Sequence, residues 1–251
     1  MTSYSKEFYN EMEDTNLVSA RVVIPLVIDL VNPKSVIDIG CGTGLWLKAF
    51  NENGIKEITG IDGNWVDKKM LVIPEQAFTP RDLEQPLNIG KKADLAVCLE
   101  VAEHLDSSKS EQLVGSLVEM APVILFSAAI PFQGGAHHVN EQWPDYWSKI
   151  FRKNGYVPVD CLRRKIWNDG RVSFFYAQNI LIYVNKNKLT EYQKLKREIE
   201  AGYNEALPFV HPHMYLYYSE RWHLVVPFLG KINPRLLHMA KRFLGKLRKK
   251  L

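Results

Sequence analysis

Residues 36–44, near the start of the chain, constrain the fold more than any other segment. They read VIDIGCGTG, so a short apolar run leads directly into a turn that contains Gly40, Gly42 and Gly44. The apolar run is typical of a buried strand, and the pattern from Leu45 onward predicts a helix. Glycines in such a turn permit positive φ and let a ligand approach the backbone closely. The segment therefore predicts a strand, a ligand-binding loop and a helix.

Apolar strand patterns and helical patterns alternate over the first half of the chain. Strands are predicted at residues 35–39, 57–61, 77–79, 93–99 and 123–128. Helices are predicted at residues 17–31 and 45–53, in a short stretch after residue 64, and at residues 108–120, where Ser108 and Glu111 would form a capping box. This alternation predicts a parallel sheet with helices on both faces.

The pattern changes after residue 128. Pro144 stands at the first position of a predicted helix. Two further strands, residues 157–167 and 174–184, are joined through Asp169-Gly170, a pair typical of a β-hairpin turn. We therefore expect a doubly wound, Rossmann-like α/β fold. Its seven-stranded sheet would be mostly parallel and would end in an antiparallel pair.

Basic residues concentrate at the C-terminus. The net charge is +4, yet residues 231–251 contain eight Lys or Arg and no Asp or Glu. Apolar residues at helical spacing in this tail predict an amphipathic helix. It could lie on an anionic membrane surface, dock on the body or a second subunit, or fray into solvent. We expect residues 1–186 to form one domain and residues 187–251 a helical and aromatic appendage, with a helix capped by Thr190 and Gln193 and reaching about residue 207.

Cysteine usage and hydropathy indicate the compartment. The three cysteines form no Cys-x-x-Cys pair, which argues against a disulfide framework and fits a reducing environment. The first residues lack the apolar run of a signal peptide, and no apolar stretch approaches the ~18 residues that a membrane span needs. A cytoplasmic protein is expected, with residues 231–251 as a candidate contact with the inner membrane surface.

An acidic residue precedes the glycine loop. Asp38 lies two residues before Gly40, and its charge suits a cationic ligand better than a pyrophosphate. The segment resembles the first motif of class I S-adenosylmethionine-dependent methyltransferases, and the resemblance extends over residues 17–185. It implies S-adenosylmethionine as the cofactor, with Asp38 orienting its methionine end. The loop residues implied in binding are Gly40, Cys41, Gly42 and Gly44. An NAD-dependent enzyme and a catalytically silent cofactor-binding protein are the alternative classes.

The same resemblance assigns cofactor contacts after the second and third strands. Asp62, with Gly63 beside it, would accept hydrogen bonds from both ribose hydroxyls. Asp82 would bind the adenine amino group, and Leu83 would lie near the ring. Read without the resemblance, Asp62 and Asp82 are also ordinary turn residues. Trp65 could pack on the adenine or in the core.

A Glu-x-x-Glu-His segment follows the fourth predicted strand. In a helix, Glu100, Glu103 and His104 would share one face, and His138 follows the fifth strand at the same edge of the sheet. The two segments resemble the small-RNA 3′-terminal 2′-O-methyltransferases, and the first alone resembles metal-dependent ubiquinone-pathway O-methyltransferases. These resemblances imply that the four residues hold Mg²⁺ or another divalent metal. Without a metal, His104 or His138 is the expected base, Glu100 is counted with them among the catalytic residues, and the residues of the Glu-x-x-Glu-His segment would position the methionine amine or simply pack.

The same segment bears on the acceptor. Methylation of planar nitrogens would call for an Asn/Asp-Pro-Pro-aromatic sequence after the fourth strand, whereas this chain has Glu-Val-Ala-Glu at residues 100–103. A hydroxyl acceptor is therefore favoured. Residues 127–131 and the aromatic segment 209–222 give the chain a resemblance to methyltransferases of bacterial surface-glycan gene sets. That resemblance implies a small saccharide or saccharide-linked acceptor rather than nucleic acid. An RNA 2′-O-methyltransferase remains the alternative.

Overall fold

A computed structural model describes residues 6–87 and 89–219. The chain divides into two compact units, Met1–Phe209 and Val210–Leu251. Residues 187–209, which were expected in the appendage, belong to the first unit. The predicted tail helix at residues 231–251 lies outside the described residues. Within the described part of the chain, no helix is both long and apolar enough to cross a bilayer.

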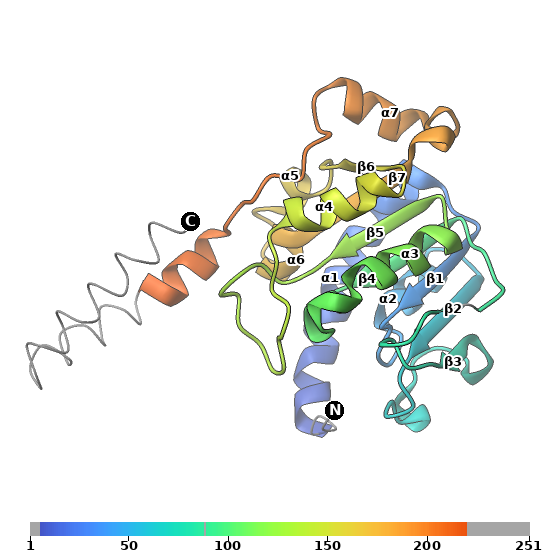
Figure 1. The fold of residues 1–251 in the computed structure, drawn as a ribbon. Coiled ribbons are helices and arrows are strands. Elements are labelled where there is room, and N and C mark those ends of the chain that lie inside the picture. Colours follow the sequence, from blue (N-terminus) through green and yellow to red (C-terminus); the bar gives the residue numbers. More distant parts are fainter. Residues whose placement is uncertain (1–5, 88, 220–251) are drawn as a thin grey trace, which may run out of the picture. The chain divides into compact units, whose positions relative to one another are not determined.

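A seven-stranded sheet forms the centre of the first unit (Figure 1), in the order β3-β2-β1-β4-β5-β7-β6. β7 is antiparallel to both of its neighbours, and the other neighbouring strands are parallel. This arrangement confirms the predicted fold class. The strands are β1 Ser35–Ile39, β2 Glu57–Asp62, β3 Phe78–Pro80, β4 Leu95–Leu99, β5 Val123–Ser127, β6 Tyr156–Val159 and β7 Leu181–Asn185.

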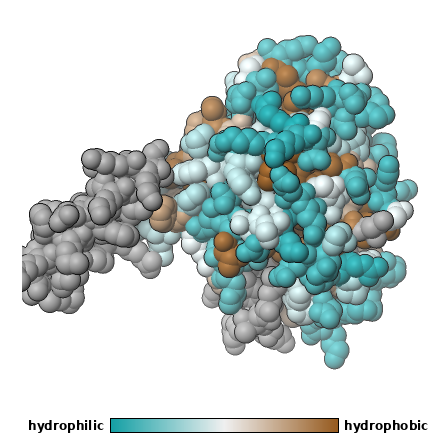
Figure 2. All heavy atoms as spheres, in the orientation of Figure 1, coloured by the Kyte–Doolittle hydropathy of each residue, from teal (hydrophilic) through white to brown (hydrophobic). Residues whose placement is uncertain are grey.

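Helices cover both faces of the sheet because its strands are apolar on both sides. In β5, Val123 and Leu125 join a core with α1 (Lys6–Val31) and α2 (Leu45–Glu52). Ile124 and Phe126, pointing the other way, join a second core with α3 (Ser110–Met120) and α4 (Pro144–Lys153). Figure 1 shows α3 and α4 in front of the sheet. The coloured residues in Figure 2 are mostly hydrophilic, with hydrophobic ones in small patches, as expected when the apolar side chains are enclosed.

Short elements complete the unit. The remaining α-helices are α5 (Arg163–Ile166), α6 (Phe174–Asn179) and α7 (Gln193–Glu200), and α7 packs on α1. Five 3₁₀ segments are described, at Lys68–Met70, Glu75–Ala77, Ala102–His104, Ser107–Lys109 and Lys186–Glu191.

The antiparallel pair forms without the predicted hairpin. β6 and β7 do pair, but the residues between them fold into α5 and α6. Asp169 lies in the turn between these two helices, where its carboxylate accepts the Arg171 amide at 3.0 Å. Ile166 and Tyr176 bury their side chains in the core against α1 and α2. The hairpin prediction was wrong because an Asp-Gly turn with its own side-chain hydrogen bond serves a helix–helix connection equally well.

Two predicted helix boundaries also differ. Asp106, rather than Ser108, caps the start of the α3 region by accepting the Ser108 amide at 2.9 Å, and this begins a 3₁₀ turn before the helix. The predicted capping box is therefore wrong. α7 begins at Gln193 but ends at Glu200, short of the expected residue 207. Pro144 occupies the first turn of α4, as predicted.

Candidate active site

A cleft of about 1030 Å³ opens at the carboxyl ends of β1, β2 and β4. The loops after these strands supply most of its lining, and Asn16 of α1 and Tyr176 of α6 add to the wall. β2 and β4 lie on opposite sides of β1, so the strand order reverses here. Open α/β sheets bind their ligands at such a point.

The glycine loop between β1 and α2 forms the floor of the cleft. Gly40, Gly42 and Gly44 have φ values of +77°, +52° and +93°. A Cβ on Gly40 would lie 2.3 Å from Cγ2 of Val101, so the loop can approach the segment after β4 only without a side chain there. A Cβ on Gly42 would meet no described atom within 4 Å, and Gly42 lines the cleft. A larger side chain at Gly42 would therefore enter the space where a ligand binds.

Two buried carboxyl groups, Asp38 and Asp62, border the loop. The Asp62 carboxylate accepts the Gly42 amide at 2.7 Å and the Gly63 amide at 2.6 Å. Burial raises the pKa of Asp62, while these two hydrogen bonds lower it. Burial, and then the charge of Asp62, raise the pKa of Asp38 to about 8. A cationic ligand in the cleft would favour the ionised form of both groups.

The predicted adenine-binding residues line the other end of the cleft. Leu83 is buried, and Asp82 is exposed and accepts the Glu84 amide at 2.9 Å in a turn. The Trp65 ring lies against Gly63, where an added Cβ would come within 2.2 Å of ring atoms. Trp65, Asp82 and Leu83 all line the cleft. Trp65 is therefore a wall of this end of the cleft rather than a core residue, with 41% of its surface exposed.

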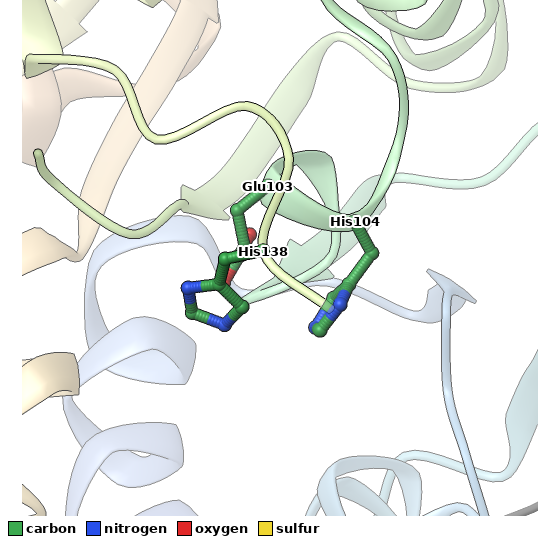
Figure 3. A group of neighbouring side chains, drawn as sticks. All are labelled: Glu103, His104 and His138. Carbon is green, nitrogen blue, oxygen red and sulfur yellow. The ribbon is translucent and has the colours of Figure 1, made fainter. Parts of the chain in front are cut away.

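Glu103, His104 and His138 converge on one side of the cleft. Each offers a ligand atom, and these atoms all lie within 4.8 Å of one another. Figure 3 shows the two imidazole rings directed to the same side, with the Glu103 carboxylate behind His138. The ring centroids are 4.9 Å apart. Three of the four predicted metal ligands are thus brought together.

The two segments that carry this group are bonded to each other. Glu103 and His104 lie in the 3₁₀ turn after β4, and His138 lies in the loop after β5. The Glu103 carbonyl accepts the amides of Val139 at 2.8 Å and Asn140 at 3.0 Å. The side-chain amide of Asn140 donates to the hydroxyl of Ser110 in α3 at 3.1 Å. These bonds fix the position of His138 relative to the turn.

Glu100, the fourth predicted ligand, lies near Glu103 but is not one of the three converging residues. Its carboxylate accepts hydrogen bonds from Gln133 at 2.8 Å and Asn179 at 3.1 Å. Glu100 has φ +53°, so the chain turns sharply before the 3₁₀ segment instead of forming the helix that would have aligned Glu100 with Glu103. Burial raises the pKa of Glu100, and hydrogen bonds from Asn179, Ser127 and Gln133 oppose that shift.

Burial controls the protonation of the converging group. It lowers the pKa of His104 to about 4, with a further contribution from His138, so the His104 ring is neutral near pH 7. Burial, followed by the charge of Glu100, raises the pKa of Glu103 well above its usual value. Both Glu103 carboxylate oxygens are buried and make no hydrogen bond of normal geometry to a described residue, although the Ala129 backbone and the Glu100 side chain are near enough to affect the pKa of Glu103. A buried carboxyl group that makes no hydrogen bond of normal geometry, beside two imidazoles, is a donor set that a divalent cation would satisfy.

Several residues of the cleft were not predicted from the sequence. Asn16, Phe175 and Tyr176 line it from helices far from the motifs in sequence, and the Asn16 Oδ1 atom is buried with no partner in the described part of the chain. Gln133, which lines the cleft, donates to Glu100, and Glu141, which is not a lining residue, lies within hydrogen-bond distance of His138; both follow β5. The sequence signal that could have indicated Gln133 and Glu141 is their closeness in sequence to His138. No local pattern singled out the three helix residues.

Comparison with protein families identifies the chain. The sequence pattern of the methyltransferase domain family matches residues 17–147, more than half of the chain, including the glycine loop and the Glu-x-x-Glu-His segment. The chain belongs to this methyltransferase family. The expected enzyme class, an S-adenosylmethionine-dependent methyltransferase, is therefore confirmed.

Two solved structures agree with the methyltransferase fold. DesVI of Streptomyces venezuelae superposes with a TM-score of 0.53 at 14% identity, over 71% of this chain and 95% of that chain. Human N-acetylserotonin methyltransferase in complex with SAM gives a TM-score of 0.50 at 16% identity, over 71% of this chain and 55% of that one. The methyltransferase domain of bacterial CtHen1 gives a TM-score of 0.49 at 20% identity, over 68% of this chain and 98% of that chain. The comparison with curated proteins gives no match for the methyltransferase.

Proposed function

We propose that this methyltransferase transfers the methyl group of S-adenosylmethionine to a hydroxyl of a small acceptor, a saccharide or a saccharide-linked molecule. The observation that carries the proposal is the convergence of Glu103, His104 and His138 in the same cleft as the glycine loop. Methyl transfer from a sulfonium needs the acceptor held in line with the donor and a group that helps the acceptor lose its proton. One cleft contains candidates for both tasks.

The cofactor would lie along the loops after β1, β2 and β3. Asp38 and Asp62 place two carboxyl groups beside the glycine loop, which suits the cationic methionine end and the ribose hydroxyls. Gly42 leaves the space next to the loop open. Leu83 and Trp65 offer apolar surface for the adenine, with Asp82 at the rim.

The converging group fits a divalent cation, and Glu103, His104 and His138 would hold it. The fit rests on the buried Glu103 carboxylate, which makes no hydrogen bond of normal geometry to a described residue, and on two imidazoles directed to the same side. One carboxylate with two imidazoles suits Mn²⁺, Fe²⁺ or Zn²⁺ better than Mg²⁺, which prefers oxygen ligands. When bound there, the cation would lower the pKa of the acceptor hydroxyl.

The wall next to this group suits a hydroxylated ring. Gln133 and His137 are polar, whereas Phe175 and Tyr176 present aromatic surface to the same cleft. Sugars combine hydroxyls with an apolar ring face, so such a wall matches them. The cleft volume of about 1030 Å³ is enough for the cofactor and a small acceptor together.

The test is methyl transfer from labelled S-adenosylmethionine to a panel of saccharides and nucleotide-linked saccharides, with Mn²⁺ present and after chelation. We expect transfer to an oxygen atom, loss of transfer after chelation and in Glu103→Gln and His138→Ala proteins, and recovery of the wild type when Mn²⁺ is restored. Glu111→Gln is the matched control, because Glu111 forms only an exposed ion pair with Lys153. Full activity in excess chelator would remove the metal from the proposal. Transfer to nitrogen or to RNA would remove the acceptor class.

A further inference from the structure

The carboxylate of Glu141 binds the loop that carries His138 at three points. One oxygen accepts the Gly134 amide at 2.8 Å and lies 3.0 Å from Nδ1 of His138. The other oxygen accepts the Phe132 amide at 2.7 Å. The side chains of His138 and Glu141 are only 13% and 20% exposed, so these bonds are partly shielded from water.

The loop needs such a restraint. Phe132 and His137 have φ values of +70° and +62°, left-handed conformations that are strained for residues with a side chain. Phe132 is also 63% exposed, so packing contributes little to holding it. The Glu141 carboxylate accepts the amide of Phe132 itself and that of Gly134, and so stabilises the loop in this shape.

The same carboxylate sets which nitrogen of His138 is free. An ionised carboxylate only accepts hydrogen bonds, so a neutral imidazole 3.0 Å away from it would carry its proton on Nδ1 and keep the lone pair on Nε2. Gly135 leaves room at that nitrogen, because a Cβ there would lie 2.3 Å from Nε2. A histidine that binds a metal through one ring nitrogen usually donates its other N–H to a carboxylate or carbonyl.

We propose that Glu141 is a positioning residue that fixes the His138 tautomer and the 132–138 loop, so that Nε2 of His138 joins Glu103 and His104 in binding a divalent cation. This inference rests on the metal site of the proposed function. Glu141 itself acts through His138 and lies outside the group of three ligands.

The first test is Mn²⁺ binding, followed by electron paramagnetic resonance and calorimetry, in the wild type, Glu141→Gln and Glu111→Gln. Glutamine offers one acceptor oxygen instead of two, and its NH₂ group can donate to Nδ1 and force the proton onto Nε2. We expect Glu141→Gln to bind Mn²⁺ about 10–100-fold more weakly, with S-adenosylmethionine affinity unchanged within about twofold. Equal Mn²⁺ affinity in the wild type and Glu141→Gln would overturn the role of Glu141. A wild type that binds no Mn²⁺ would instead overturn the proposed metal site.

The second test needs no variant. In ¹⁵N-histidine-labelled, metal-free wild type, two-bond ¹H–¹⁵N correlations distinguish the two imidazole tautomers. The inference predicts that His138 carries its proton on Nδ1. A proton on Nε2 would contradict it even if the Glu141→Gln protein failed to fold.

Discussion

The Asp62 carboxylate accepts the backbone amide of Gly42 at 2.7 Å, which ties the end of β2 to the glycine loop after β1. Its other oxygen accepts the Gly63 amide at 2.6 Å, so the side chain shapes both segments at the centre of the cleft. The same oxygens are the predicted acceptors for the ribose hydroxyls. Asp62 therefore organises the loop before a ligand arrives and would contact the ligand afterwards.

Replacing Asp62 with alanine should weaken S-adenosylmethionine binding by about 10–100-fold, since a hydrogen bond to a charged group contributes about 1.5–3 kcal/mol. Calorimetric titration would measure the change. Asp145→Ala, which removes an exposed partner of Lys149 on α4, is the control and should bind normally. Unchanged affinity in the Asp62→Ala protein would take this residue out of the cofactor site.

Replacing Gly40 with alanine should destabilise the fold more than Gly54→Ala does. Both glycines have positive φ, +77° and +92°, so both variants carry backbone strain. Only at Gly40 does the new Cβ meet Val101, at 2.3 Å, whereas at Gly54 no described atom lies within 4 Å. We expect an additional loss of about 1–3 kcal/mol in the free energy of unfolding for Gly40→Ala, measured in urea. Equal losses would show that Val101 moves aside freely.

Binding of S-adenosylmethionine near pH 7 should release a proton from Asp38. The pKa of this group is about 8 in the folded, ligand-free protein, so it is mostly protonated at pH 7. A cationic ligand favours the carboxylate and lowers that pKa. Calorimetry in buffers of different ionisation enthalpy would count the protons released, and Asp38→Asn should release fewer. Identical proton release in both proteins would contradict the assignment.

The same pKa predicts a dependence of stability on pH. The unfolded chain loses the Asp38 proton near its ordinary pKa of 3.8, whereas the folded protein keeps it until about pH 8. The contribution of Asp38 to stability is therefore fully present below about pH 4 and declines as the pH rises toward 8. Between pH 5 and pH 8.5, Asp38→Asn should lose less free energy of unfolding than the wild type. A parallel decline in both would show that other groups account for it.

Replacing Asn179 with alanine should destabilise the protein more at high pH than at low pH. Asn179 donates to Glu100 at 3.1 Å and to Gln133 at 2.9 Å, and its side chain is buried. Its bond lowers the pKa of Glu100, so its loss penalises the ionised carboxylate. We expect a cost of about 1–3 kcal/mol, growing with pH through the titration of Glu100. A loss of stability that does not change with pH would show that Asn179 contributes through packing and not through its hydrogen bond to Glu100.

The sequence predicted those parts of the molecule that local pattern determines. Apolar strands between helical segments give a doubly wound sheet, and the glycines at residues 40, 42 and 44 adopt the positive φ that their turn requires. The hairpin prediction failed because α5 and α6 form between β6 and β7 and their apolar side chains join the core that contains α1 and α2. An Asp-Gly pair carries no information about that tertiary packing.

The candidate site, too, was predicted only where strand order determines it. Glu103 and His138 converge because consecutive parallel strands, β4 and β5, end at the same edge of the sheet. Glu100 does not join them, since its left-handed backbone turns its carboxylate toward Asn179, which is 79 residues away in sequence. Contacts of that kind depend on the whole fold.

The most direct test of the account is to identify the atom that receives the methyl group. S-adenosylmethionine carrying a ¹³C methyl group would be incubated with the wild-type protein, Mn²⁺ and the saccharide panel, and the product examined by mass spectrometry and carbon–proton correlation spectra. We expect a labelled methyl ether on a sugar oxygen, formed by the wild type and absent with His138→Ala. A labelled methyl group on nitrogen, carbon or sulfur would contradict it.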